Sequence, residues 1–308
     1  MQTNVHAAQG RAAGTTPLLF GLSIGAVAAL ILLAASPALG QGRFEGARPM
    51  GMASAFTASA SGNGALYHNP AGVGTIFMYS VEGSYQLSPD GFNTLNASIV
   101  DSKLNPKLAA GAAYSYEFNS DEDNNFTGHD ARVALASPVV PERLVLGVGG
   151  RYLSFTQGKE DLLSGFTLDV GATLRIADGF FMGVSGNNLI DPCQGNDADC
   201  PAVAAPRSVG GGLAFGSSIG FLISADVRAD FSPDDDVRMI YAGGAEILLA
   251  QVLALRAGYQ YRDLEKENVL GVGGGIKTDA VGIDVGYQRR FEAKEDILNI
   301  ALQLYFFL

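Results

Sequence analysis

The chain has 308 residues, of which 47% are hydrophobic and 17% charged, with 40 glycines and no tryptophan. This apolar content excludes a disordered chain, and the glycines lack the three-residue period of a collagen-like fibre. A formal net charge of -11 gives no basic surface for nucleic acid, so we expect no nucleic-acid partner. Two cysteines are too few for a disulfide-stapled scaffold.

Residues 1–40 are predicted to form a secretory signal peptide. Residues 18–35 are continuously apolar or small, and Ala38 and Gly40 place small side chains where a signal peptidase reads the chain. The alternative is an uncleaved anchor, because this run is barely long enough to span a membrane. We expect export, with cleavage near Gly40.

Residues 41–73 form a segment of small side chains. Sixteen of these 33 residues are Gly, Ala or Ser, so their backbone can pack closely against other structure. Near the end, Asn69 is a favourable helix N-cap and Pro70 suits a first helical position, so Asn69-Pro70-Ala71 predicts one tight turn. Two interpretations stay open: the three residues only shape a bend, or they take part in gating.

From residue 74 to residue 308 the chain alternates between apolar and polar residues. In residues 221–231 one face is apolar and the other carries Ser224, Asp226 and Arg228, which is the period of a β-strand. We count fourteen such runs, which start near residues 75, 92, 108, 126, 143, 165, 180, 207, 220, 237, 253, 269, 282 and 297. An even number of segments of about ten residues is typical of an outer-membrane barrel.

Two features place the apolar faces against lipid. The polar faces carry charges of both signs, which suit a wet lumen: Arg132, Arg151, Asp169, Arg175, Asp226, Arg228, Arg256 and Asp284. Tyrosine and phenylalanine gather near the strand ends, where interface girdles lie: Tyr114, Tyr116, Phe118, Phe155, Phe231, Tyr259, Tyr261, Tyr287 and Phe291. The sequence therefore predicts an all-β protein, a 14-stranded antiparallel transmembrane β-barrel.

The connections between the runs also alternate. Those after odd runs are mostly longer and charged: 119–125, 156–164, 191–206, 263–268 and 290–296. Those after even runs are tight: 138–142, 176–179 and 217–219. Long outside loops and short periplasmic turns are typical of outer-membrane barrels. We expect the acidic outer loops to be solvated; binding of divalent ions beside lipopolysaccharide is the alternative.

Cys193 and Cys200 share the longest outer loop. Because the periplasm is oxidising, we expect them to form a disulfide. The enclosed Asn196, Asp197 and Asp199 offer oxygen ligands for Ca²⁺, but an ordinary solvated loop is the simpler interpretation. We therefore expect no metal site.

The last run ends in alternating apolar residues, from Ile300 through Leu304 to Leu308. This pattern resembles the C-terminal signal read by the barrel-assembly machinery, although that signal usually ends in Phe. We expect that machinery, outer-membrane lipid and lipopolysaccharide to be partners of the chain. The expected location is the outer membrane of a Gram-negative bacterium.

A barrel of fourteen strands is too wide for side chains from its wall to fill. The small-residue segment before the first strand is therefore predicted to act as a plug in the lumen. The expected organisation is a signal peptide (1–40), an N-terminal plug or hatch (41–73) and a transmembrane barrel (74–308).

The segments 44–57 and 65–72, the second containing Asn69-Pro70-Ala71, resemble the hatch of the FadL-type long-chain fatty-acid transporters. They resemble the PorV-type outer-membrane proteins of secretion systems equally well. Both groups have fourteen strands, a plug rich in small residues and an Asn-Pro-Ala motif before the first strand. The resemblance implies the fold more strongly than it implies a cargo.

Two functions follow from this resemblance. The first is passive uptake of a small hydrophobic, fatty-acid-like compound, which would meet Phe44, Met50, Met52 and Phe56 of the plug. It would leave after hatch movement or through a wall opening, for which a β-bulge at Gly111 is a candidate. The second is an adapter in a secretion or envelope complex, without transport. A pocket against the plug favours uptake, and a tightly packed lumen favours an adapter.

No constellation of catalytic residues is apparent. His129 and Asp130 are sequence neighbours, so on a strand they face opposite ways. The stretch Gly271–Thr278 superficially resembles a phosphate loop, but no helix follows it, and we expect a Gly-rich strand. We therefore expect neither enzymatic activity nor a cofactor.

Overall fold

The computed structural model describes residues 44–88, 91–119, 125–192, 205–217, 219–232 and 236–306. The predicted signal peptide, and the loop that holds Cys193 and Cys200 with its candidate calcium ligands, lie outside these ranges. None of the described helices is long and apolar enough to cross a membrane.

Four short helical elements precede the strands within the described residues. They are α2 (Ala47–Gly51), η1 (Gly62–Gly64), α3 (Ala65–His68) and η2 (Pro70–Gly74). The strands are β1 (Tyr79–Leu87), β2 (Phe92–Asp101), β3 (Ala109–Asn119), β4 (Phe126–Val140), β5 (Leu144–Gln157), β6 (Glu160–Ala177), β7 (Phe180–Asn187), β8 (Ser208–Gly216), β9 (Phe221–Asp230), β10 (Arg238–Leu249), β11 (Leu253–Arg262), β12 (Glu267–Lys277), β13 (Val281–Arg290) and β14 (Glu295–Tyr305).

The fourteen strands form one closed barrel in which each strand pairs with its sequence neighbours. The first and last strands complete the ring by antiparallel pairing, with Ser80 opposite Tyr305 and Leu87 opposite Leu298. All the pairs are antiparallel. Closure gives each of these fourteen strands a hydrogen-bonded neighbour on both edges, as a lipid environment requires. The predicted 14-stranded antiparallel barrel is confirmed.

The two faces of the wall differ as a lipid-facing barrel requires. In β9, Ile223 and Val227 are exposed on the outside, whereas Ser224 and Asp226 are buried on the inside. A soluble sandwich would bury the apolar residues of this strand instead. The outer surface is thus apolar, and the enclosed surface carries the polar and charged side chains.

Two predicted strand boundaries are wrong. The first strand begins at Tyr79 rather than near residue 75, because η2 occupies residues 70–74 and Met78 bonds through its N–H to Ser102. The predicted loop 156–164 is mostly strand, because β5 runs to Gln157 and β6 starts at Glu160. Gly158 has a φ of 61°, a conformation that favours glycine and allows this tight turn.

The predicted bulge at Gly111 is also wrong. The register runs without interruption through Gly111 on both sides, opposite Val100 and Ala134. A Cβ atom added there would lie 2.9 Å from Leu66, so glycine serves close packing rather than a bulge. In the described strands, the register shifts lie near strand ends: 138–140, 155–156 and 175–177.

The aromatic residues near the strand ends divide between the two faces. Tyr114, Phe231, Tyr259 and Phe291 are exposed, as expected for girdle residues. Phe155, by contrast, is buried on the inner side and belongs to a hydrophobic cluster of β4, β5 and β6.

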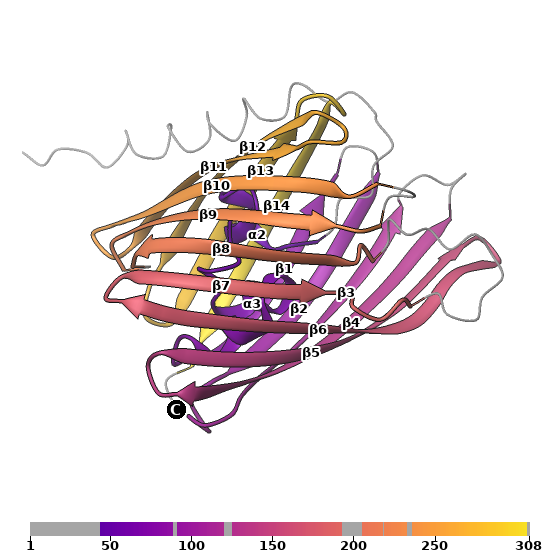
Figure 1. Ribbon diagram of the computed structural model, residues 1–308. Helices are drawn as coiled ribbons and strands as arrows, with labels where there is room; N and C mark the ends of the chain where they lie inside the picture. Colours follow the sequence, from indigo (N-terminus) through magenta and orange to yellow (C-terminus); the bar gives the residue numbers. More distant parts are fainter. Residues whose placement is uncertain are drawn as a thin grey trace, which may run out of the picture. The chain divides into compact units, whose positions relative to one another are not determined.

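Residues 44–78, called here the inner segment, lie within the ring of strands. Figure 1 shows this part of the chain, in indigo, enclosed by the wall with its helices α2 and α3. Helix α2 contacts β11 to β14, and η2 contacts β3 to β6 on the other side of the ring. The inner segment therefore crosses the space that the barrel encloses.

Candidate functional site: the inner segment and its cavity

Asn69, Pro70 and Ala71 form a capped turn. The side chain of Asn69 accepts a hydrogen bond from the Ala71 N–H at 3.1 Å, and Pro70 is the first residue of η2. The Asn69 amide also donates to the Thr57 carbonyl at 2.9 Å, so it joins two parts of the inner segment. Asn69 is completely buried, and its role exceeds that of a simple cap.

Two glycines of the wall accommodate this turn. Gly147 in β5 and Gly171 in β6 are opposite each other in the sheet. A Cβ atom at Gly147 would lie 2.3 Å from the Ala71 nitrogen, and one at Gly171 would lie 1.9 Å from the Asn69 side-chain oxygen. The pair therefore forms a notch in the wall that only glycine permits.

Further glycines on the opposite wall make room for the other half of the inner segment. Cβ atoms at Gly244 and Gly258 would lie 2.6 Å and 2.3 Å from the Met52 carbonyl oxygen. A Cβ atom at Gly286 would lie 2.3 Å from the Ala47 carbonyl oxygen. The Gly-rich stretch 271–278 is mostly strand β12, as predicted, rather than a phosphate loop.

Asp226 fixes the middle of the inner segment to the wall. One of its oxygens accepts hydrogen bonds from the N–H groups of Phe56, at 2.8 Å, and Thr57, at 2.7 Å. Two backbone N–H groups of the inner segment therefore have their acceptor on the wall, as buried N–H groups require. Asp226 is a predicted lumen charge, and the structure gives it this anchoring contact.

A chain of ion pairs joins α2 to strands β10, β11 and β13. Arg48 binds both carboxylate oxygens of Glu246 at 2.9 Å, and its third nitrogen donates to Ser61 at 2.7 Å. Arg256 also binds Glu246 and reaches Asp284, both at 2.5 Å. Arg48 thus connects the inner segment to a charged network of the wall.

A second charged network lies on strands β4, β5 and β6. Asp130 accepts from Arg132 and Arg151, at 2.8 Å each, and Arg151 donates to Asn188 at 2.9 Å. Asp169 accepts from the Asn188 N–H at 2.6 Å. Asp130 is thus paired with two arginines, and Asp169 has a hydrogen-bond donor, as burial of charged groups requires.

Other predicted residues lie apart from these networks. Arg175 is near the end of β6, where it pairs with the exposed Asp178 at 2.8 Å. Arg228 is half-buried near the end of β9. The side chain of His129 bonds to Tyr114 at 2.6 Å, whereas Asp130 is buried inside, so the two neighbours do face opposite ways.

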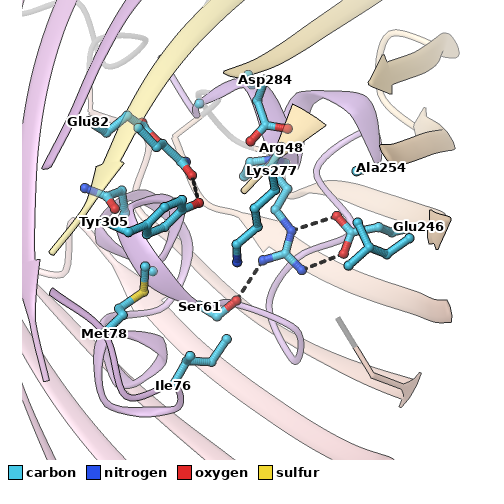
Figure 2. Close-up of a pocket in the computed structure, with 18 of the residues that line it drawn as sticks. Arg48, Ser61, Ile76, Met78, Glu82, Glu246, Ala254, Lys277, Asp284 and Tyr305 are labelled. Carbon is cyan, nitrogen blue, oxygen red and sulfur yellow. Dashed lines mark hydrogen bonds and ion pairs between the residues drawn. The ribbon is translucent and has the colours of Figure 1, made fainter. Parts of the chain in front are cut away.

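A cavity of about 370 Å³ adjoins the inner segment at the end of the barrel where β1 begins and β14 ends. Figure 2 shows Arg48 and Ser61 at this cavity, with Lys277, Tyr305 and Glu246 from the wall around them. Its remaining lining is mixed: apolar residues such as Ile76, Met78 and Phe306 alternate with polar ones. The cavity therefore has both an apolar and a charged side.

The four candidate ligand contacts are all buried: Phe44, Met50, Met52 and Phe56. Phe56 lines the cavity and lies under the guanidinium of Arg48, 5.0 Å from its ring centre. Phe44 instead packs edge-on against Tyr67, with ring centres 4.9 Å apart. The structure thus places one of the four, Phe56, at the cavity.

Sequence reasoning missed Glu246, Ser61 and Lys277. Glu246 stands in a mostly apolar stretch, and its partner Arg48 is 198 residues away. One signal was available: Glu246 is in phase with Gly244 two residues before it, and Arg256 with Gly258 two residues after it, and charges and glycines at alternate positions mark the inward face.

Several solved structures share this fold. The monoaromatic hydrocarbon channel CymD has a TM-score of 0.64 at 13% identity, covering 86% of this chain and 98% of that chain. The toluene transporter TodX of Pseudomonas putida has a TM-score of 0.64 at 12% identity, covering 86% and 100%. A FadL homologue of Pseudomonas aeruginosa has a TM-score of 0.62 at 10% identity, covering 89% and 100%.

These similarities establish the fold: the chain has the FadL-like barrel architecture that the hatch resemblance implied. No family model and no curated protein matches its sequence.

Proposed function

We propose that this protein is an outer-membrane channel for the passive uptake of a small hydrophobic compound, with residues 41–73 as its plug. Three solved structures of the same fold are a monoaromatic hydrocarbon channel, a toluene transporter and a FadL homologue. Residues 1–40 would direct export, and residues 74–308 would form the membrane barrel. The apolar outer face supports this location.

The cavity beside Arg48 is the observation that carries the proposal. It contacts the inner segment through Arg48, Phe56 and Ser61, and its volume of about 370 Å³ suits a small molecule. A compound that passed the plug would enter this cavity before leaving the barrel. On the predicted orientation, this end of the barrel faces the periplasm.

The expected route runs past the plug rather than through the wall. In β3 the hydrogen-bonding register is continuous, so the wall offers no opening at Gly111. The contacts of Arg48 with Glu246 and Ser61 are made by side chains and can separate without unfolding a strand. We therefore assign gating to the Arg48 side of the plug, and a fixed anchor to Asn69-Pro70-Ala71.

One observation favours the alternative function, an adapter in an envelope complex. The inner segment fits closely into glycine notches on two sides of the wall, at Gly147 and Gly171 and at Gly244 and Gly258. A well-packed lumen is what a barrel without transport would need. Measuring uptake separates the two functions.

The test uses a Gram-negative host that degrades toluene but lacks its own hydrocarbon channel. Oxygen consumption on added toluene reports how fast the compound crosses the outer membrane. We expect the full-length protein to raise this rate several-fold above the empty vector. An unchanged rate, with the folded barrel present in the outer membrane, would contradict uptake and favour the adapter.

A further inference from the structure

The wall at β14, β1 and β2 meets the inner segment differently from the rest of the ring. Each strand from β5 to β7 and from β10 to β13 has a glycine that receives the backbone of the inner segment, as Gly183 does for Thr57 and Gly271 does for Met50. Strands β14 and β2 contain no glycine, and Gly83 of β1 is exposed on the outer face. In this sector the wall therefore presents side chains to the inner segment instead of a glycine notch.

A row of polar side chains follows the inner face of β1. Four of them alternate along the strand and are buried: Ser80, Glu82, Ser84 and Gln86. On the neighbouring strands, Asn96 of β2 lies opposite Ser84, and Asn299 of β14 lies opposite Gln86. These six residues are called here the β1 seam.

Three members of the β1 seam have buried polar atoms without a hydrogen-bond partner among the described residues. These atoms are the hydroxyl of Ser84, the side-chain oxygen of Asn96 and both polar atoms of Asn299. Asn299 is completely buried, and Ser84 and Asn96 are more than nine-tenths buried. Because buried polar groups need hydrogen-bond partners, these atoms point to a ligand within the seam.

The chemistry of the β1 seam defines this ligand. The Asn299 amide requires an acceptor for its NH₂ group and a donor for its oxygen. Apart from Glu82, the members of the seam are neutral, so an ion among them would lose its hydration without meeting an opposite charge. Water is small and neutral, both donates and accepts, and makes roughly three hydrogen bonds when it is buried in a protein.

The β1 seam lies between two regions that solvent reaches. At one end Glu82 lines the cavity, where Figure 2 shows it beside Tyr305. On the loop side of the inner segment, the side chains of Glu45 and Arg290 are 13% and 16% exposed. The buried stretch from Glu82 to Gln86 rises only about 13 Å along the strand. A short file of waters can bridge this distance.

We propose that a file of water molecules occupies the β1 seam and that the barrel conducts water along it while the inner segment stays in place. Ions are excluded, because the middle of the seam offers amide and hydroxyl groups but no charge. This activity is separate from the uptake proposed above, since it needs no movement of the inner segment and involves no hydrophobic compound. A negative toluene test leaves it unaffected.

The first test measures contact between water and the side-chain amide of Asn299. It uses water-edited solid-state NMR of the full-length protein in lipid bilayers, with ¹⁵N-labelled asparagine. Asn69 is the internal control, because it is equally buried but its amide donates to the Thr57 carbonyl at 2.9 Å. We expect the Asn299 signal to build up several-fold faster than the Asn69 signal, with Asn299→Ser and Asn69→Ser identifying the two. Equal build-up at both amides would overturn the proposal.

The second test measures water conduction by stopped-flow light scattering from proteoliposomes under an osmotic gradient. Asn299→Leu replaces the amide with an apolar side chain of similar size, so we expect the protein-dependent water flux to fall several-fold. Asn299→Ser keeps a polar group and retains the flux. Asn187→Leu is the matched control and leaves the flux unchanged, because Asn187 is a buried asparagine of β7, outside the seam.

An unchanged flux in folded Asn299→Leu would contradict conduction along the β1 seam. If this variant does not fold, the unmodified protein decides the question by comparison with protein-free liposomes. A flux no greater than that of the protein-free liposomes would likewise overturn the proposal.

Discussion

Gly147 and Gly171 face each other across β5 and β6, and together they form the notch that holds the Asn69 turn. The atoms that a Cβ would meet at Gly147 belong to the backbone of Pro70 and Ala71, so no side-chain rotation can relieve the clash. This relationship explains part of the high glycine content. It also makes the turn an anchor of the inner segment.

Gly147→Ala is therefore expected to destabilise the barrel or expel the turn from its notch, at a cost of about 1–3 kcal/mol. The measurement is the temperature at which the protein loses its compact migration in a semi-native gel. Gly83→Ala is the matched control, because a Cβ at Gly83 meets nothing within 4 Å. If Gly147→Ala and Gly83→Ala lost their compact migration at the same temperature, the close fit of the Asn69 turn against Gly147 would be contradicted.

Removal of the Asp226 carboxylate should loosen the middle of the inner segment. Asp226→Ala leaves the N–H groups of Phe56 and Thr57 without their acceptor, which costs about 1–3 kcal/mol for each unsatisfied group. Asp226→Asn keeps one acceptor oxygen and should be milder. Limited proteolysis within residues 44–78 measures the effect, and Asp178→Ala, at an exposed turn, should leave cleavage unchanged.

Arg48→Ala should make the barrel leaky. The variant removes both the ion pair with Glu246 and the hydrogen bond to Ser61, while Arg256 still neutralises Glu246. Single-channel recording in planar bilayers should show more frequent openings than the unmodified protein. Arg175→Ala removes an arginine near the end of β6 and serves as the control. Identical traces for Arg48→Ala and the unmodified protein would exclude a gating contact.

The expected disulfide between Cys193 and Cys200 is tested by mass spectrometry under non-reducing conditions. A bond lowers the mass of their peptide by about two hydrogens, and closing so short a loop contributes about 2–3 kcal/mol of stability. The double variant Cys193→Ser/Cys200→Ser should therefore unfold at a lower temperature than the unmodified protein. Free thiols in the purified protein would contradict this expectation.

The barrel could be predicted from the sequence because its signal is local. Each strand alternates with a period of two, and the tight turns between strands carry their own residue types. The turn at Gly158 was misjudged because polar residues such as Lys159 and Glu160 suit a long loop as well as the ends of two strands. The pairing register of β5 with β6, which brings Gln157 opposite Glu160, decides between a long loop and a tight turn, and residue composition does not reveal it.

The arrangement inside the barrel could not be predicted in the same way. Glu246, the partner of Arg48, is 198 residues away in the sequence. Asp226, which accepts from the N–H groups of Phe56 and Thr57, is 170 residues from Phe56. Only closure of the ring brings such residues together. The hatch resemblance indicated where the inner segment begins and ends, but not which wall residues hold it.

A reversible cross-link between the inner segment and the wall tests the uptake mechanism most directly. The hydroxyl oxygens of Ser59 and Ser224 are 3.5 Å apart, so the pair Ser59→Cys/Ser224→Cys is close enough for a disulfide. In the toluene-degrading host, we expect uptake to fall to the empty-vector rate when the pair is oxidised. It should recover on reduction, while each single variant behaves like the unmodified protein. Undiminished uptake with the cross-link fully formed would show that the compound does not pass by movement of the inner segment.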